Sequence, residues 1–313
     1  YRRALQGANG RPVIIRTVDV GGDKPLSYLH LPHEDNPFLG YRAVRVYPEF
    51  EGLFRQQLRA MLRASPAGRL RIMIPMVSRT EEAEWVRRVM TEERAALAAA
   101  GVPVDPSVEL GTMIEVPAAA FLLDRLSRHV DFFSIGTNDL LQYFTAVDRS
   151  SARVGALYTP AQPAFLRLLQ KISGDARAAG RWVGMCGEMA GQLQYLPLLV
   201  GIGLDEISLA PPLIGAAKAA LSAISSGAAR DLLGRAIDAG SAAEVEALLD
   251  RPASTRPAPL TTPDVVLLDG RARSKHEAIK EAVDLVYGAG RTEAPGAIER
   301  AVWLRETACP SGF

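Results

Sequence analysis

The segment 184–191, which reads GMCGEMAG, places a single cysteine between small residues, directly after a short apolar run. Flexible backbone on both sides of Cys186 would let its thiol face a substrate. A buried cysteine is, however, more often a small hydrophobic side chain that only fills space. The segment by itself leaves both interpretations open.

Two carboxylates stand at the ends of consecutive predicted strands. Glu115 ends the run 108–115, and Asp139 comes just after the run 130–135. Consecutive parallel strands lie side by side, so we expect both side chains at one edge of the sheet. A pair of carboxylates there offers the hard oxygen ligands that suit Mg²⁺. The alternative is that Asp139 caps a helix beginning near Leu140.

Three arginines lie at or near predicted strand ends and follow the same pattern. Arg16 and Arg42 come early in the chain, and Arg149 follows the Asp139 segment. The planar guanidinium group suits phosphate and carboxylate groups. Arginines beside two carboxylates therefore indicate an anionic substrate bridged by a metal. The alternative is ordinary solvated surface charge, since the chain has 36 Lys and Arg residues.

The segment 136–139, which reads GTND, adds a possible anion site. Backbone amides in a glycine-containing turn from strand to helix can receive an anion. The side chain of Asn138 can donate to a carboxylate or a phosphate, while Asp139 binds a metal.

These residues need a scaffold that brings strand ends together. Short apolar runs rich in β-branched residues alternate with amphipathic stretches, which predicts a parallel sheet with helices outside it. The predicted strands are 12–20, 43–46, 71–76, 108–115, 130–135, 182–186 and 206–209, of which 43–46 is the weakest. The predicted helices include 50–64, 81–99, 117–129, 163–179 and 213–225. Eight strands would close a barrel, whose active site lies at the carboxyl ends of the strands.

The fold class predicted from this alternation is α/β, and with an eighth strand residues 1–250 would form a (β/α)8 TIM barrel. Since seven strands are predicted, we expect the first barrel strand to lie before Tyr1 or to have been missed. Residues 251–264 contain four prolines and are predicted to form an extended linker. Residues 265–313 are predicted to be a partial C-terminal α/β appendage, with a capping box formed by Ser274 and Glu277.

Composition restricts the classes of protein. The 313 residues are 48% hydrophobic and carry a formal net charge of +1, which argues against a general nucleic-acid binder. The two cysteines, Cys186 and Cys309, cannot form a disulfide framework, so we expect a reduced, cytoplasmic protein. No apolar run approaches the length of a membrane span, and we expect no membrane insertion. The chain opens without methionine and stops abruptly, so we expect a fragment of a longer protein.

Seven segments in order resemble the phosphoenolpyruvate-binding domain of enzyme I of the bacterial sugar phosphotransferase system. They are RTVDVGGDK (16–24), NPFLGYR (36–42), LRIMIPM (70–76), GTMIEVPA (111–118), DFFSIGTNDL (131–140), AVDR (146–149) and GMCGEMAG (184–191). Pyruvate phosphate dikinase and phosphoenolpyruvate synthase look similar around Asn138, Asp139 and Cys186. The segments 16–24 and 36–42 favour enzyme I.

The resemblance implies a barrel, often dimeric, that binds phosphoenolpyruvate and Mg²⁺. Glu115 and Asp139 match its metal ligands, and Arg16 and Arg149 match arginines that hold the phosphoryl group. Arg42 matches an arginine near the bridging or enolate oxygen.

Two further positions match groups that contact or protonate the substrate. Asn138 matches a residue that contacts the anionic groups, and Cys186 matches the acid that protonates the enolate carbon of pyruvate. The phosphoryl group then passes to a histidine of a separate N-terminal domain, and from there to the phosphocarrier protein HPr for sugar uptake. The resemblance places that histidine and another phosphate-binding arginine before Tyr1.

The tail resembles the beginning of a fructose/mannitol-type enzyme IIA domain, in residues 274–282, 290–291 and 297–306. The expected parent is therefore a fused multiphosphoryl transfer protein. Two alternatives stay open at this point. One is a dikinase or synthase relative, and the other is a non-catalytic barrel that serves dimerisation or regulation.

Overall fold

The computed structural model describes residues 1–21 and 34–250, together with Lys280 and Asp284. The chain divides after Asp250 into two units, Tyr1–Asp250 and Arg251–Phe313. The predicted linker 251–264 lies outside the described residues. The predicted appendage 265–313 also lies outside them, except for Lys280 and Asp284, which are helical and exposed.

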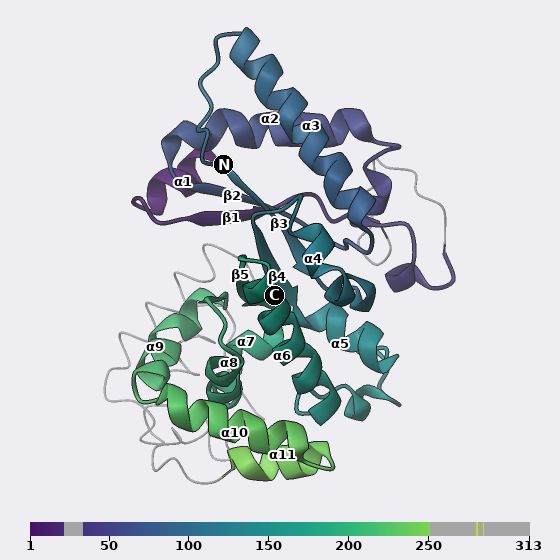
Figure 1. The fold of residues 1–313 in the computed structure, drawn as a ribbon, viewed down its shortest axis with the longest axis vertical. Coiled ribbons are helices and arrows are strands. Elements are labelled where there is room, and N and C mark those ends of the chain that lie inside the picture. The colour runs from purple at the N-terminus through teal and green to yellow at the C-terminus, as the bar shows by residue number, and fades with distance from the viewer. Residues whose placement is uncertain (22–33, 251–279, 281–283, 285–313) are drawn as a thin grey trace. The chain divides into compact units, whose positions relative to one another are not determined.

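A parallel sheet organises the first unit, and its strands follow one another in space as they do along the chain (Figure 1). Each strand pairs in parallel with the next. The strands are β1 (Val13–Arg16), β2 (Leu70–Ile74), β3 (Glu109–Ile114), β4 (Phe132–Gly136), β5 (Trp182–Cys186) and β6 (Glu206–Ile207). The predicted α/β class is confirmed. The described residues form six such strands, and the closed eight-stranded barrel is not shown by them.

The two faces of the sheet differ because side chains alternate along each strand. One face is aliphatic and aromatic, for example at Ile72, Leu110 and Phe133, and belongs to the main hydrophobic core. The other face carries a smaller cluster, built on Met73, Met113 and Phe132, with Ile14, Trp182 and Cys186 packed against it. The second face therefore leads up to the polar strand ends.

Helices supply the remaining framework of the first unit. They are α1 (Arg2–Gly7), α2 (Glu51–Ala64), α3 (Thr80–Ala99), α4 (Leu123–Leu126), α5 (Thr137–Thr145), α6 (Pro163–Ala178), α7 (Glu188–Gly191), α8 (Leu196–Ile202), α9 (Ile214–Ser222), α10 (Ser226–Asp238) and α11 (Ala242–Leu249). In α2, Phe54, Leu58, Met61 and Leu62 recur at helical spacing and are buried. Figure 1 shows α2 beside α3, and α8 packs against α10.

The predicted strand 43–46 is wrong, because these residues form a 3₁₀ helix, Ala43–Val46. Ala43 has a φ of 53°, which no strand accommodates. Its amide donates to the carbonyl of Val20, next to the isolated bridge between Gly21 and Arg42. Val44 and Val46 are therefore apolar because they enter the core, not because they belong to the sheet.

The ends of other elements also differ from the sequence prediction. The strand predicted at 12–20 is shorter in the structure, where only β1 is extended in the sheet. The helix predicted at 117–129 divides into a 3₁₀ helix, Pro117–Phe121, and α4. The helix α5 begins at Thr137, with Gly136 as its N-cap. The interpretation of Asp139 as a helix cap is therefore wrong, and Asp139 lies inside the first turn.

Membrane insertion has a structural test among the described residues. None of their helices combines the length and the apolar character that a bilayer span requires.

Candidate functional site

A cavity of about 340 Å³ opens at the carboxyl ends of the strands. The sequence-predicted residues that line it are Arg16, Glu115, Asn138, Asp139, Arg149 and Cys186. They come from β1, β3, α5, β5 and the segments that follow them. The fold thus gathers six of the seven predicted site residues around one space.

Glu115 follows β3 directly and is 2% exposed. Its Oε1 accepts a hydrogen bond of 2.6 Å from the amide of Met76. A Cβ on Gly136 would lie 2.7 Å from Glu115 Oε2, so only glycine leaves room for this carboxyl. Burial, reinforced by the negative charge of Asp139, raises the pKa of Glu115 to about 7. Because the charge of Asp139 acts on Glu115, a cation between the two carboxylates would be favoured.

The carboxylate of Asp139 contacts the guanidinium groups of two arginines. Arg149 Nη1 lies 3.0 Å from Oδ1, and Arg42 Nη2 lies 3.5 Å from Oδ2. The guanidinium of Arg149 also stacks 5.4 Å from the ring centroid of Phe38, and its amide donates to Gln142 Oε1. The position of Arg149 is therefore set by two parts of the chain, α5 and the segment around Phe38.

Arg42 differs from the other predicted arginines because it does not line the cavity. Its side chain is fully buried, and it donates to Asp19 through Nε at 3.3 Å and through Nη2 at 3.1 and 2.9 Å. Burial acts to lower the pKa of Arg42, but the hydrogen bonds and charge of Asp19, with the charge of Asp139, raise it overall. Arg42 thus contacts Asp139 from a buried position outside the cavity lining.

Arg16 is the accessible arginine of this group. It ends β1, its side chain is 41% exposed, and its Nη1 lies 3.5 Å from Asp19 Oδ2. A guanidinium that keeps contact with solvent can exchange water for an anionic ligand at low cost.

Asn138 is held on both its side chain and its backbone. Its Oδ1 accepts from the amide of Glu188 at 2.8 Å, and its carbonyl oxygen accepts from the hydroxyl of Tyr158 at 2.9 Å. The amide NH₂ group then remains the donor of this side chain. Since α5 begins at Thr137, backbone amides of its first turn lie at the same place.

Cys186 ends β5, and its Sγ accepts a hydrogen bond of 3.5 Å from the hydroxyl of Ser134. Burial raises the pKa of the Cys186 thiol, although the hydrogen bond from Ser134 opposes this shift. Gly187 follows with a φ of 113°, and a Cβ there would lie 2.3 Å from Thr137 Oγ1. Because its pKa is raised, the Cys186 thiol is protonated near neutral pH. It is suited to donate a proton rather than to attack as a thiolate.

The sequence prediction missed three polar residues of this region. Asp19 holds Arg42, Ser134 donates to Cys186, and Glu206 at the start of β6 lines the cavity. The contact between Ser134 and Cys186 could be found from the sequence, because side chains alternate along neighbouring strands. Asp19 lies at the end of the predicted strand 12–20, but its contact with Arg42 could not be predicted, and Glu206 carries no comparable signal, because both roles depend on contacts distant in sequence.

The donor set fits a hard divalent cation that also binds substrate. Among residues 1–21, 34–250, 280 and 284, no three His, Cys, Asp or Glu side chains gather as a metal cluster. Mg²⁺ usually binds through one or two carboxylates plus substrate phosphate, and it needs no closed protein cage. Glu115 and Asp139 meet that requirement.

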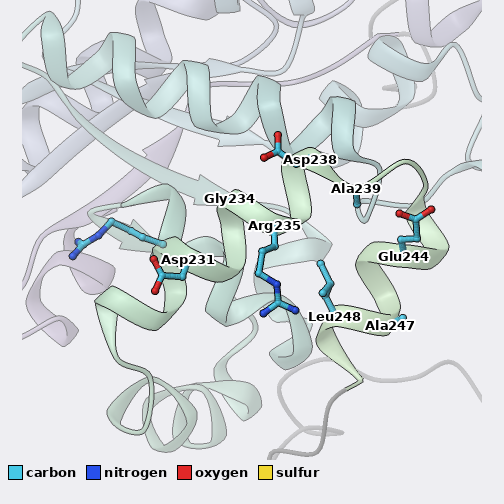
Figure 2. A pocket seen from close by; sticks show the side chains of 9 residues that line it. Asp231, Gly234, Arg235, Asp238, Ala239, Glu244, Ala247 and Leu248 are labelled. Carbon is cyan, nitrogen blue, oxygen red and sulfur yellow. The ribbon is translucent and has the colours of Figure 1, made fainter.

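A second cavity of about 790 Å³ lies between α10 and α11. Figure 2 shows Arg235 and Leu248 lining it, with Asp231, Asp238 and Glu244 along its edges. All three acids are exposed, and none of the predicted site residues lies there. This cavity therefore lacks the buried carboxylates and the thiol of the first.

The fold and the site define a class. Residues 1–226 match the family described as "PEP-utilising enzyme, PEP-binding domain", where PEP is phosphoenolpyruvate. The chain belongs to this family, and the resemblance found in the sequence is confirmed. Among solved structures, a citrate lyase from Burkholderia xenovorans LB400 is 18% identical with a TM-score of 0.42, covering 63% of this chain and 68% of that one.

Particular relatives have longer chains. Multiphosphoryl transfer protein 2 of Escherichia coli (strain K12) is 46% identical over 314 residues, which cover 100% of this chain and 38% of the relative. Phosphoenolpyruvate-protein phosphotransferase of Bacillus sp. (strain S) is 46% identical over 251 residues, 80% of this chain and 43% of the relative. That of Lactococcus lactis subsp. lactis (strain IL1403) is 53% identical over 211 residues, 67% of this chain and 37% of the relative. The chain thus spans about two fifths of the length of these relatives.

Proposed function

We propose that this chain is the phosphoenolpyruvate-binding part of a phosphoenolpyruvate-protein phosphotransferase. The observation that carries the proposal is one cavity lined by Glu115, Asp139, Arg16, Arg149 and Cys186. A doubly charged phosphate ester with a carboxylate needs cationic groups, a metal site and a proton donor. The residues that line this space include side chains suited to each of these three roles.

Phosphoryl transfer depends mainly on positioning and charge neutralisation. Arg16 and Arg149 bind the phosphoryl oxygens, and the amide of Asn138 donates to the anionic groups of the substrate. Glu115 and Asp139 would hold Mg²⁺, which would neutralise negative charge on the substrate oxygens. Arg42 keeps Asp139 in place without touching the substrate.

The remaining product is the enolate of pyruvate, which must gain a proton on carbon. The Sγ–H bond of Cys186 breaks, and its proton joins the methylene carbon. The carbon–carbon double bond supplies the electron pair, the enolate oxygen becomes a ketone, and the thiol becomes a thiolate. The raised pKa of Cys186 supports this role, because the thiol carries its proton when the enolate forms.

The whole phosphotransferase has further parts under this proposal. The phosphoryl group moves to a histidine of a separate N-terminal domain, then to HPr, and serves sugar uptake. The names and greater length of the relatives support this assignment. We propose a domain at 1–250, a linker at 251–264 and an enzyme IIA-like segment at 265–313. The resemblance supports a homodimer, and the free thiol of Cys186 supports a cytoplasmic location.

Calorimetry of phosphoenolpyruvate binding, with and without Mg²⁺, tests the proposal. We expect Mg²⁺ to tighten binding, and we expect Glu115→Gln and Asp139→Asn each to weaken the Mg²⁺-dependent affinity by about tenfold or more. Asp238→Asn is the matched control, because it removes an exposed carboxylate beside the second cavity. Binding that ignores Mg²⁺, or that responds to Asp238 instead, would count against the site.

A further inference from the structure

Glu206 is a half-buried acid that the proposed mechanism does not use. It begins β6, its side chain lines the same cavity as Cys186, and its Oε2 is buried without a hydrogen-bond partner among the described residues. A buried carboxyl oxygen without a partner is costly. Such a group in a reaction cavity therefore calls for an explanation.

The neighbouring strands connect Glu206 with the Cys186 thiol. Gly184 pairs in register with Glu206 on one side and with Ser134 on the other. A Cβ on Gly184 would lie 2.4 Å from Glu206 Oε2, so the carboxyl occupies the space that a side chain would fill. The carboxyl of Glu206 and the hydroxyl of Ser134 thus border one space over Gly184.

The thiol lies one step further along the same face. Cys186 is two residues beyond Gly184, and alternation places both on one side of β5, about 7 Å apart along the strand. Ser134 donates to Cys186 Sγ at 3.5 Å. The cavity of about 340 Å³ also has room for several water molecules. Hydroxyl and water can therefore carry a proton from Glu206 to the thiol.

The charges around both groups favour a protonated carboxyl beside the thiol. Burial raises the pKa of Glu206, while the positive charge of Arg71 on β2 opposes the shift. Burial also raises the pKa of Cys186, and the charges of Glu115 and Glu206 add to it while Arg16 opposes it. Each group therefore holds its proton to higher pH than usual.

We propose that Glu206 is the proton-exchange partner of the Cys186 thiol, a role that rests on the proposed function of Cys186. After the thiol has given its proton to carbon, the O–H bond of Glu206 breaks and a new S–H bond forms through the Ser134 hydroxyl and cavity water. The Glu206 carboxylate then regains a proton from solvent. Glu206 acts through Cys186 and does not contact the substrate carbon.

The first test measures the thiol and needs no substrate. The chain has two cysteines, so Cys309→Ser leaves Cys186 as the single reactive thiol. We expect Glu206→Gln to move the pH profile of iodoacetamide alkylation to lower pH by about 0.5–1.5 units, because the carboxylate that opposes thiolate formation is gone. Glu188→Gln removes an exposed acid two residues from Cys186 and should leave the profile in place. An unmoved profile in Glu206→Gln overturns the inference.

The second test follows exchange of pyruvate methyl protons with D₂O by NMR, in the full chain with Mg²⁺. We expect Glu206→Gln to slow exchange about tenfold or more at saturating pyruvate, with an unchanged half-saturating concentration. Gly184→Ala, which keeps Glu206 and Cys186 but puts a Cβ into the space that the Glu206 carboxyl occupies, should slow it too. If Glu206→Gln shifts the pH profile of alkylation but exchanges the methyl protons of pyruvate at the full rate, the relay is overturned. If the unsubstituted chain does not exchange, the proposed role of Cys186 fails, while the thiol profile still decides whether Glu206 is its partner.

Discussion

The ion pair between Arg42 and Asp19 should couple much more strongly than its length suggests. Three hydrogen bonds, with donor–acceptor distances of 3.3, 3.1 and 2.9 Å, join the two side chains. Their side chains are 0% and 2% exposed. Removing one member of a buried pair typically costs about 3–5 kcal/mol, because the other charge stays buried without its partner. We therefore expect Arg42→Met alone, and Asp19→Asn alone, to lower the free energy of unfolding by amounts of this order.

A double-mutant cycle isolates the pair from its surroundings. The free energy of unfolding is measured by urea denaturation for the unsubstituted chain, the two single variants and the double variant. We expect a coupling energy of about 2–3 kcal/mol, since hydrogen bonds to charged groups contribute about 1.5–3 kcal/mol. The contact of Arg42 with Asp139 disappears in Arg42→Met and in the double variant alike, so it cancels in the cycle.

Arg87 and Asp131 provide the matched control. Their charged atoms lie 2.7 Å apart, closer than those of the buried pair, but their side chains are 31% and 35% exposed. Exposed pairs contribute about 0–1 kcal/mol, because water and salt screen the charges. If Arg87 and Asp131 couple as strongly as Arg42 and Asp19, the reasoning from burial is refuted.

Two further predictions concern pH and domain organisation. Because burial raises the pKa of Glu206, the folded chain binds a proton that the unfolded chain releases, and this group lowers the free energy of unfolding as pH rises through the interval between the two pKa values. Glu206→Gln should therefore flatten the fall in stability that sets in as pH rises above 4.5, the ordinary pKa of a glutamate, in urea titrations. An identical slope in both proteins would contradict it. Removal of residues 251–313 should leave the unfolding of 1–250 and its binding of phosphoenolpyruvate within experimental error of the full chain. Loss of binding in calorimetry would show that the site needs the tail.

The elements that could be predicted are those in which local pattern and tertiary role agree. β2 is an apolar run and α2 an amphipathic one, and the ends predicted for them differ from the observed ends by no more than two residues. The run 43–46 misled the prediction, because Val44 and Val46 have the pattern of a strand while the backbone at Ala43 turns into a left-handed conformation. That turn depends on the pairing of Gly21 with Arg42, which no local pattern records.

The candidate site divides in the same way. Glu115, Asp139 and Cys186 could be predicted because the carboxyl ends of parallel strands must meet at one edge of the sheet. The difference between Arg16, which is open to solvent, and Arg42, which is sealed behind Asp139, could not be predicted. Both are arginines that follow an apolar run, and only packing distinguishes them.

By itself, the sequence determined the order of the strands, the residue types at their ends and the family to which those motifs belong, because each is encoded within short segments. The tertiary structure decided which charges are buried, that Arg42 contacts Asp139 from a buried position, and that Glu206 lies in the space left by Gly184. Burial and protonation depend on atoms brought together from distant parts of the chain. The sequence around Cys186 therefore made its thiol a candidate, and the surroundings that form on folding raise the pKa of that thiol.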